Sequence, residues 1–147
     1  MKSLLRATLL ASAVFTLSNA NAQNATITAA AKEEGAVTTP SGLVYRSLKD
    51  GTGASPATSD TVKVHYRGTF PDGKEFDSSY KRGQPIEFPL SGVIKCWTEG
   101  VQRVKVGGKA KLTCPPAIAY GERGAGGVIP PNATLVFEVE LLGVSGK

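Results

Sequence analysis

Residues 61–77 read TVKVHYRGTFPDGKEFD, which is an alternating run, a turn and a second extended run. From Val62 to Tyr66 the even positions are apolar and the odd positions polar. That period of two predicts a β-strand over Thr61–Gly68 with one face turned to a core. Pro71-Asp72-Gly73 is a turn signal, and Lys74–Asp77 predicts the returning strand. The stretch therefore predicts an antiparallel hairpin.

Similar alternation recurs on both sides of this hairpin. It predicts further strands at Gly42–Leu48, Ile86–Leu90, Lys109–Cys114 and Leu135–Leu141. Only Val93–Val104 has helical spacing, with Val93, Trp97 and Val101 on one face, and Gly100 weakens that signal. The pattern predicts an α+β fold in which one short α-helix lies across the apolar face of an antiparallel sheet.

Composition narrows the classes of function. The chain has 147 residues, 17 Lys and Arg, 12 Asp and Glu, one His and two Cys. This length suits a single ordinary domain. One His excludes most multi-histidine metal sites, and we expect no metal and no cofactor. Lys105, Lys109 and Lys111 predict a solvated basic face, so nucleic acid is not an expected partner.

The first 22 residues have the organisation of a secretory signal. Lys2 and Arg6 precede an apolar stretch, and Ala20-Asn21-Ala22 is a small-residue cleavage site. A buried N-terminal helix is the alternative. Cleavage near Ala22 would leave a flexible leader over 23–40, with a short helical stretch around 29–34, and a domain over 41–147. We expect a periplasmic or secreted protein without a stable membrane anchor.

Aromatic side chains cluster on the predicted inward faces or beside them. They are Tyr66, Phe76, Phe88, Trp97, Tyr120 and Phe137. They are either plain core or the lining of a cavity. Trp97 is large enough to form a cavity floor, and its N–H needs a partner if buried. The Gly-rich loop Glu122–Gly127 lacks the following helix and Lys-Ser/Thr pair of a phosphate loop, so it is interpreted as a mobile flap.

Five runs in this sequence resemble the FKBP-type peptidyl-prolyl cis-trans isomerases, which bind the macrolides tacrolimus and rapamycin. These runs are VKVHYRG (62–68), DGKEFDSS (72–79), VIKCWTEG (93–100), AYG (119–121) and IPPNATLVF (129–137). They cover nearly all of residues 41–144 in family order. The resemblance implies a five- to six-stranded antiparallel sheet wrapped around one short α-helix. The signal and the TPSGL opening at 39–43 are most similar to exported bacterial members.

The resemblance also implies a proline pocket with assigned roles. Trp97 would be its floor, and the Tyr120 hydroxyl and the Ile94 backbone N–H would bond substrate carbonyls. Asp77 would stand at the rim, and Asp77, Tyr120, Trp97 and Phe137 form the expected catalytic set. The expected substrate contacts are Tyr66, Phe76, Ile86, Val93, Ile94 and Ile129, with Ile86 where many members carry Phe. Ala125 replaces a bulkier flap residue.

Such a site needs no nucleophile. Resonance opposes rotation of a peptide bond by about 18–20 kcal/mol, and the twisted X–Pro amide is less polar than the planar one. An apolar pocket therefore favours the twisted form, and we expect noncovalent catalysis on proline-containing, exported polypeptides. A periplasmic chaperone or peptide-binding module on the same fold, with little isomerase activity, is the alternative.

Cys96 and Cys114 carry a separate prediction. Two cysteines in an exported chain favour a disulfide. Cys114 is on the inward face of its strand, and Cys96 begins the helix that covers that face, so they are expected to approach. Two buried free thiols are the alternative. A catalytic Cys–His pair is a third hypothesis, and the position of His65 on the opposite face argues against it.

Overall fold

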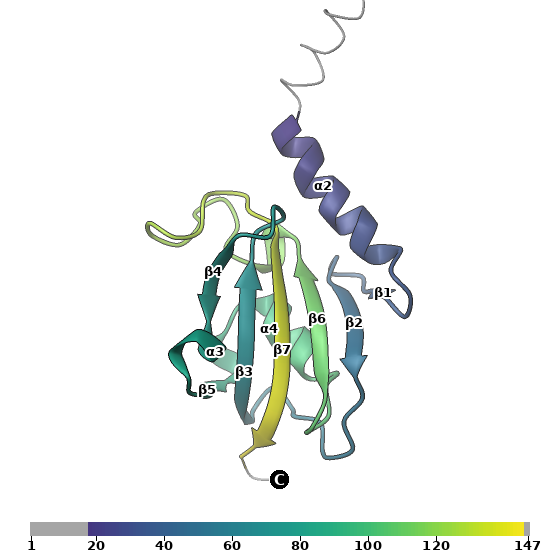
Figure 1. The fold of residues 1–147 in the computed structure, drawn as a ribbon, viewed down its shortest axis with the longest axis vertical. Helices are drawn as coiled ribbons and strands as arrows, with labels where there is room; N and C mark the ends of the chain where they lie inside the picture. Colours follow the sequence, from purple (N-terminus) through teal and green to yellow (C-terminus); the bar gives the residue numbers. More distant parts are fainter. Residues whose placement is uncertain (1–17, 146–147) are drawn as a thin grey trace, which may run out of the picture.

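The computed structural model describes residues 18–145, which form one antiparallel sheet with a short helix against its face (Figure 1). The strands are β1 (Val37–Thr38), β2 (Val44–Lys49), β3 (Thr61–Thr69), β4 (Glu75–Ser78), β5 (Ile86–Pro89), β6 (Lys109–Cys114) and β7 (Leu135–Val144). The helices are α2 (Ser18–Ala31), α3 (Ser79–Arg82) and α4 (Lys95–Val101), with 3-10 turns η1 (Leu90–Gly92) and η2 (Pro116–Ile118). The predicted fold class is confirmed. The sheet has seven strands instead of five or six, because β1 adds a two-residue strand.

Strand β3 organises the sheet. Its neighbours follow the order β1-β2-β6-β7-β3-β4, and β5 also pairs with β3. β7 runs along one edge of β3, while β5 pairs with residues 61–64 and β4 with residues 67–69 of the other edge. Two short strands thus share one long edge, and the chain between them has to leave the sheet. Helix α3 forms in that gap.

Helix α4 packs on the apolar face of the sheet (Figure 1). It is shorter than the expected Val93–Val104, with Trp97, Gly100 and Val101 on its buried side. A Cβ on Gly100 would lie 2.8 Å from a methyl carbon of Leu112 on β6. The glycine that weakens the helical pattern therefore lets the helix approach the sheet closely.

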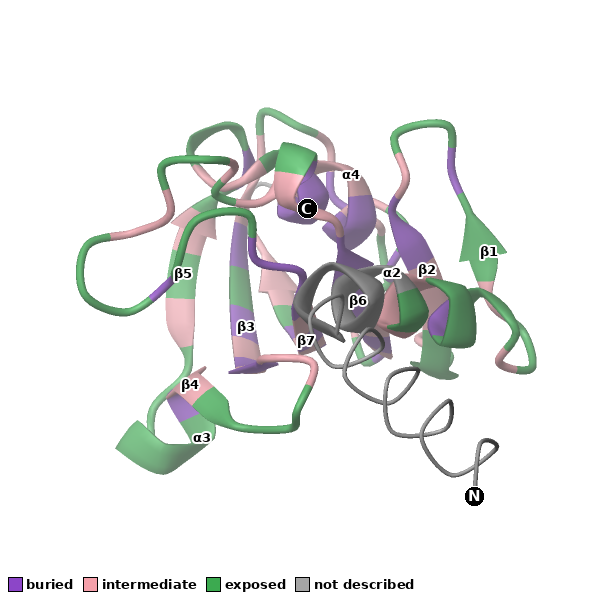
Figure 2. Cartoon of the chain, turned by 90° about the horizontal axis from the view of Figure 1, so that it is seen from above, coloured by how far each residue is buried: buried purple, intermediate pink, exposed green. Residues whose placement is uncertain are grey.

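The two faces of β3 differ as the alternation predicted. Val62 and Val64 are fully buried, whereas Lys63 is exposed and His65 half-buried, as the banding of β3 in Figure 2 shows. On β6, Lys109 lies 3.5 Å from Glu138 and Lys111 2.9 Å from Glu33. The basic face expected from the sequence is therefore partly neutralised by carboxylates.

The N-terminal segment is more regular than expected. Residues 23–40, predicted as a flexible leader, contain most of α2 and all of β1. Ala30 is buried at the end of α2, and Glu33 bonds both Lys111 and Arg46. These contacts hold the end of α2 and the residues just after it against β2 and β6. The predicted signal peptide lies mostly outside the described residues, and no helix within 18–145 is both long and apolar enough to cross a membrane.

Candidate active site

A pocket of about 290 Å³ opens between α4 and the end of the sheet where β3, β4 and β7 meet. It is lined by Tyr66, Phe76, Asp77, Phe88, Gly92, Val93, Ile94, Trp97, Tyr120 and Phe137. Six of these ten side chains are aromatic, and only Asp77 is acidic. The cavity is therefore an apolar site with polar groups at few positions, the usual form of a small-ligand site.

Trp97 stands at the centre of the aromatic lining. Its ring meets Tyr66 at 5.2 Å, Phe88 at 5.4 Å and Phe137 at 5.5 Å, with interplanar angles between 84° and 90°. Edge-to-face pairs at these distances add about 0.5–1.5 kcal/mol each beyond the burial of their surface. The indole is thus fixed from three sides. Its N–H is buried, and the described residues offer it no hydrogen-bond acceptor, contrary to expectation.

Two features beneath the lining hold it in place. The predicted disulfide joins Cys96, next to Trp97, to Cys114 at the end of β6, with Cα atoms 5.8 Å apart. A Cβ on Gly68 of β3 would lie 2.5 Å from Cζ of Phe76 and 3.0 Å from Cε1 of Phe137. The bare backbone of Gly68 therefore leaves room for these two rings.

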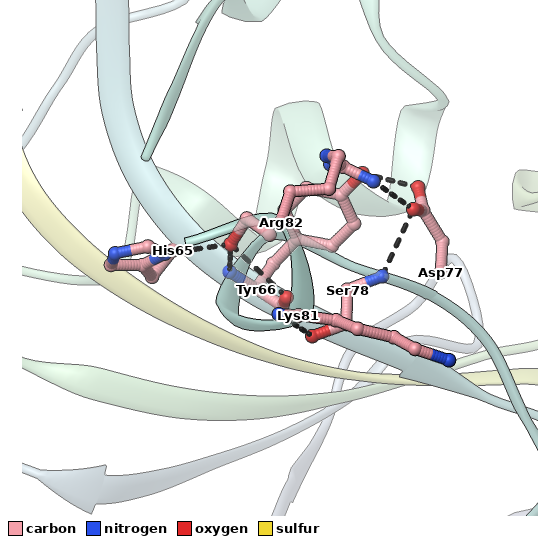
Figure 3. Close-up of polar contacts among 7 residues, drawn as sticks. His65, Tyr66, Asp77, Ser78, Lys81 and Arg82 are labelled. Atoms are coloured by element: carbon pink, nitrogen blue, oxygen red, sulfur yellow. Dashed lines mark hydrogen bonds and ion pairs between the residues drawn. The ribbon is translucent and has the colours of Figure 1, made fainter. Parts of the chain in front are cut away.

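The rim forms where β4 passes into α3. The Ser78 side chain caps α3 by accepting from the Lys81 N–H at 3.2 Å, and Gly83 ends the helix in the left-handed region at φ 75°. This single turn brings Arg82 back over Asp77, and Nη1 donates to Oδ1 at 2.6 Å (Figure 3). A short loop closed by both caps thus sets the geometry of the rim.

Tyr66 completes the rim network. Its hydroxyl donates to Asp77 Oδ2 and accepts from Arg82 Nη2, the latter at 3.2 Å (Figure 3). Arg82 was not predicted, because nothing in the sequence indicates that a side chain five residues beyond Asp77 folds back onto it.

The network shifts the ionisation of its members. Burial alone would raise the pKa of Asp77, but hydrogen bonds from Tyr66 and Arg82, the Arg82 charge and the Ser78 N–H lower it below 3.8. Burial, and next the hydrogen bond to Asp77, raise the pKa of Tyr66 above 10.0. At neutral pH the rim therefore holds a carboxylate and a neutral phenol.

Ser79 holds the backbone of Tyr66 on the side opposite the rim. This fully buried hydroxyl accepts from the Tyr66 N–H at 2.7 Å and lies 2.8 Å from His65 Nδ1. His65 also stacks on Tyr80 at 4.6 Å. His65 thus lies away from the pocket, as the alternation predicted, and the formation of the disulfide excludes a Cys–His pair.

Two hydrogen-bond donors beside the pocket have no partner among the described residues. Tyr120 is 39% exposed, and its hydroxyl has no hydrogen bond to any described residue. The Ile94 N–H, just before α4, is likewise absent from the backbone hydrogen bonds of residues 18–145. Both donors are therefore available to a ligand.

The sequence assigned most of the lining but not all of it. Ile86 packs against the core opposite Val64, and Phe88, one pleat along the same face, lines the pocket instead. Ile129 is buried at the base of the Gly-rich loop and does not line this cavity. Their assignment as substrate contacts stays a prediction that the pocket geometry does not support.

The Gly-rich loop also differs from the expected flap. None of the residues from Glu122 to Gly127 lines the pocket. Paired backbone hydrogen bonds of 2.9 Å between Ala125 and Ile129 close the loop on itself.

Within 18–145, no three His, Cys, Asp or Glu side chains gather as a metal-binding group.

Comparison with known proteins places this geometry in a family. The model for FKBP-type peptidyl-prolyl cis-trans isomerase matches residues 53–142. The FKBP-type isomerase FkpA of Escherichia coli K12 is 58% identical over 114 residues, which are 78% of this chain and 42% of FkpA. The isomerase Mip of Coxiella burnetii is 47% identical over 88% of this chain and 56% of Mip. The chain thus spans about half the length of these relatives.

Solved structures agree with the sequence comparison. The crystal structure of Escherichia coli FkpA superposes with a TM-score of 0.80 at 46% identity, over 97% of this chain and 70% of that one. An isomerase from Pseudomonas syringae gives 0.79 at 38% identity, over 85% and 92% of the two chains.

Proposed function

This chain belongs to the FKBP-type peptidyl-prolyl cis-trans isomerase family, and from that premise we propose that it catalyses rotation about X–Pro peptide bonds in the pocket over Trp97. The observation that carries the proposal is an aromatic cavity flanked by two donors without partners, Tyr120 Oη–H and Ile94 N–H. The cavity suits one pyrrolidine ring, and the donors suit the carbonyls on either side of it.

Catalysis would follow from the difference in polarity between the two forms of the amide. The planar X–Pro amide is stabilised by resonance, and its uncatalysed isomerisation takes tens to hundreds of seconds. Twisting localises the lone pair on the proline nitrogen and reduces the dipole. Aromatic walls around Trp97 and Phe137 solvate the twisted amide relatively better than water does, while the donors hold the chain. No covalent intermediate is required.

The rim would orient the bound substrate. The Asp77 carboxylate is bound to Tyr66 and Arg82, so its charge is fixed at one side of the opening. A fixed dipole there favours one direction of approach for the X–Pro amide. We assign Asp77 and Tyr120 to orientation and Trp97 and Phe137 to the apolar surface over which the bond rotates.

The proposed substrates are proline-containing polypeptides outside the cytoplasm, with tacrolimus and rapamycin as inhibitors of the same pocket. Export rests on the sequence of residues 1–22, and the boundary of the domain at 41–147 rests on the strand pattern. The family match over 53–142 lies inside that boundary.

A protease-coupled assay of X–Pro isomerisation tests the proposal. We expect the purified protein to accelerate isomerisation, the macrolides to inhibit it, and Trp97→Leu to lower kcat/KM by at least about tenfold, equivalent to about 1.4 kcal/mol. Tyr45→Leu is the matched control, because Tyr45 is an aromatic residue of β2 that does not line the pocket.

Two outcomes would contradict this assignment. Equal loss of activity in folded Trp97→Leu and Tyr45→Leu would show that the ring at position 97 has no particular part in catalysis. A folded wild-type protein without isomerase activity would favour the chaperone or peptide-binding module. That alternative predicts suppressed aggregation of a proline-free client, which isomerisation cannot produce.

A further inference from the structure

A second cavity lies along the outward face of α4 and next to the aromatic pocket. Its volume is about 840 Å³, and Lys95, Thr98, Glu99 and Gln102 of α4 and the residue after it form one side. Segments around Ser41, Thr58 and Ile118 complete the groove. The groove is shallow and open to solvent, and neither the family comparison nor the proposed catalysis assigns it a role.

The groove adjoins the pocket, because Val93 lines both. The pocket alone, at about 290 Å³, accommodates little more than one ring. An extended polypeptide advances about 3.3 Å per residue, so residues adjoining a bound proline need a surface within a few ångströms of the pocket. The groove beyond Val93 is such a surface.

Charge in the groove favours one kind of occupant. Glu99 is engaged, since it accepts from the Ser41 hydroxyl at 2.5 Å. Arg103 lies 5.9 Å above the ring of Tyr45. Lys95 is exposed, and no carboxylate of the described residues forms an ion pair with it. The charged side chains that line the groove are therefore two cations and one carboxylate, so the surface keeps a net positive charge that an acidic ligand complements.

We propose that this groove binds the extended segment of the substrate polypeptide that adjoins the target proline, and that it favours segments carrying Asp or Glu. The inference rests on the proposed isomerase function and adds a preference for client sequence to it. Lys95 is its principal specificity-determining residue, because it is a cation without a partner and follows Ile94, one of the two proposed donors, directly.

Three peptides with one X–Pro core test the groove. The first is a tetrapeptide, the second adds five residues on each side with Glu at alternate positions, and the third has Ser in place of each Glu. For the wild-type protein we expect kcat/KM for the Glu peptide to exceed that for the Ser peptide by about threefold, in the range of one charge pair at a surface. The advantage should disappear at high ionic strength.

Lys95→Glu should reverse that ratio, so that the Ser peptide becomes the better substrate. Lys63→Glu is the matched control, with the same change in net charge on the outer face of the sheet, where Lys63 is exposed on β3. It should keep the wild-type ratio. Equal rates for the two long peptides in the wild-type protein, or the same change in both variants, would overturn the proposal.

A binding measurement separates failure of the groove from failure of the isomerase. Fluorescence anisotropy of the labelled Glu and Ser peptides reports capture without turnover. If no peptide isomerises but the Glu peptide still binds in a Lys95-dependent way, the groove stands and the proposed function fails. If the peptides isomerise but the Glu and Ser peptides bind equally well, the proposed function stands and the groove proposal fails.

Discussion

Trp97 and Asp77 line the same pocket, but they are held in place by different forces. Trp97 is 4% exposed, touches three aromatic rings and follows a disulfide-bonded cysteine. The Asp77 side chain is 38% exposed and depends on hydrogen bonds to Tyr66 and Arg82. The floor is therefore part of the folding core, whereas the rim is a polar loop attached to it.

This difference predicts which changes affect stability and which affect activity alone. Removing part of the floor removes buried apolar contacts and a covalent link, so folding and catalysis should both suffer. Removing part of the rim exchanges protein hydrogen bonds for bonds to water at an exposed position, where the net effect on stability is small. Four measurements examine this contrast.

The largest effect is expected from the disulfide. Its cysteines are 18 residues apart in the sequence, and opening such a loop costs about 3 kcal/mol in the chain-entropy account. The double variant Cys96→Ala/Cys114→Ala should lose about that much free energy of unfolding in urea. A reductant should destabilise the wild-type protein in the same direction and leave the double variant unchanged. If the double variant had the same unfolding free energy as the oxidised wild-type protein, the disulfide would not stabilise the floor of the pocket.

Gly68→Ala tests the floor without removing any contact. The new methyl group would overlap the end of Phe76 and touch Phe137, which costs about 1–3 kcal/mol when rings have to move. Because Phe76 can swing at its free end, we expect kcat/KM to fall about tenfold and the fold to persist. Gly143→Ala is the matched control, since its nearest atom, Cβ of Lys63, is 3.9 Å away. Loss of activity in both variants would show that the rings above Gly68 are not the cause.

Asp77→Asn addresses the rim. Asparagine keeps the shape of the side chain but removes the charge that binds Arg82, so we expect kcat/KM to fall several-fold and the unfolding free energy to change by less than about 1 kcal/mol. A loss of three orders of magnitude or more, as for removal of a catalytic nucleophile, would contradict a purely orienting role. Arg82→Gln should give a similar, smaller effect through the same network.

The sequence predicted the floor better than the rim, and the reason is physical. A strand with one buried face must alternate, so the burial of Val62, Val64 and Tyr66 follows from their positions. The disulfide was predictable for the same reason, since alternation places Cys114 on the face that the helix covers. Long-range packing leaves a periodic trace in the sequence.

The rim and the N-terminal segment leave no such trace. Helix α3 has four residues, too few for a helical period, so the position of Arg82 over Asp77 depends on caps at Ser78 and Gly83. Phe88 and Ile86 share a strand face, and the alternation does not distinguish Phe88, which reaches the pocket from its place opposite Val62, from Ile86, which does not. Helix α2 is built from small and polar residues without an apolar stripe, so the sequence predicted only a short helical stretch around 29–34, which overlaps the end of this helix.

The smallest effect is the pH dependence of the Asp77 network. The folded protein holds the pKa of Asp77 below its usual 3.8, because hydrogen bonds and the Arg82 charge outweigh burial. A carboxyl group whose pKa is lower in the folded protein stabilises the fold at pH values above its pKa in the unfolded chain. That contribution is lost as the pH falls through the pKa of the folded protein. Since Asp77 is substantially exposed, solvent screening keeps the contribution small.

Urea unfolding of the wild-type protein and Asp77→Asn from about pH 6 to about pH 2 measures this contribution. We expect a constant difference in unfolding free energy down to about pH 5 and a decrease once the pH passes below 3.8. The variant lacks only the carboxylate of Asp77, so the difference between the two proteins isolates that group. A difference that grows towards low pH would mean that Asp77 is favoured in its protonated form, and the rim would then be held by a neutral hydrogen bond instead of the ion pair with Arg82.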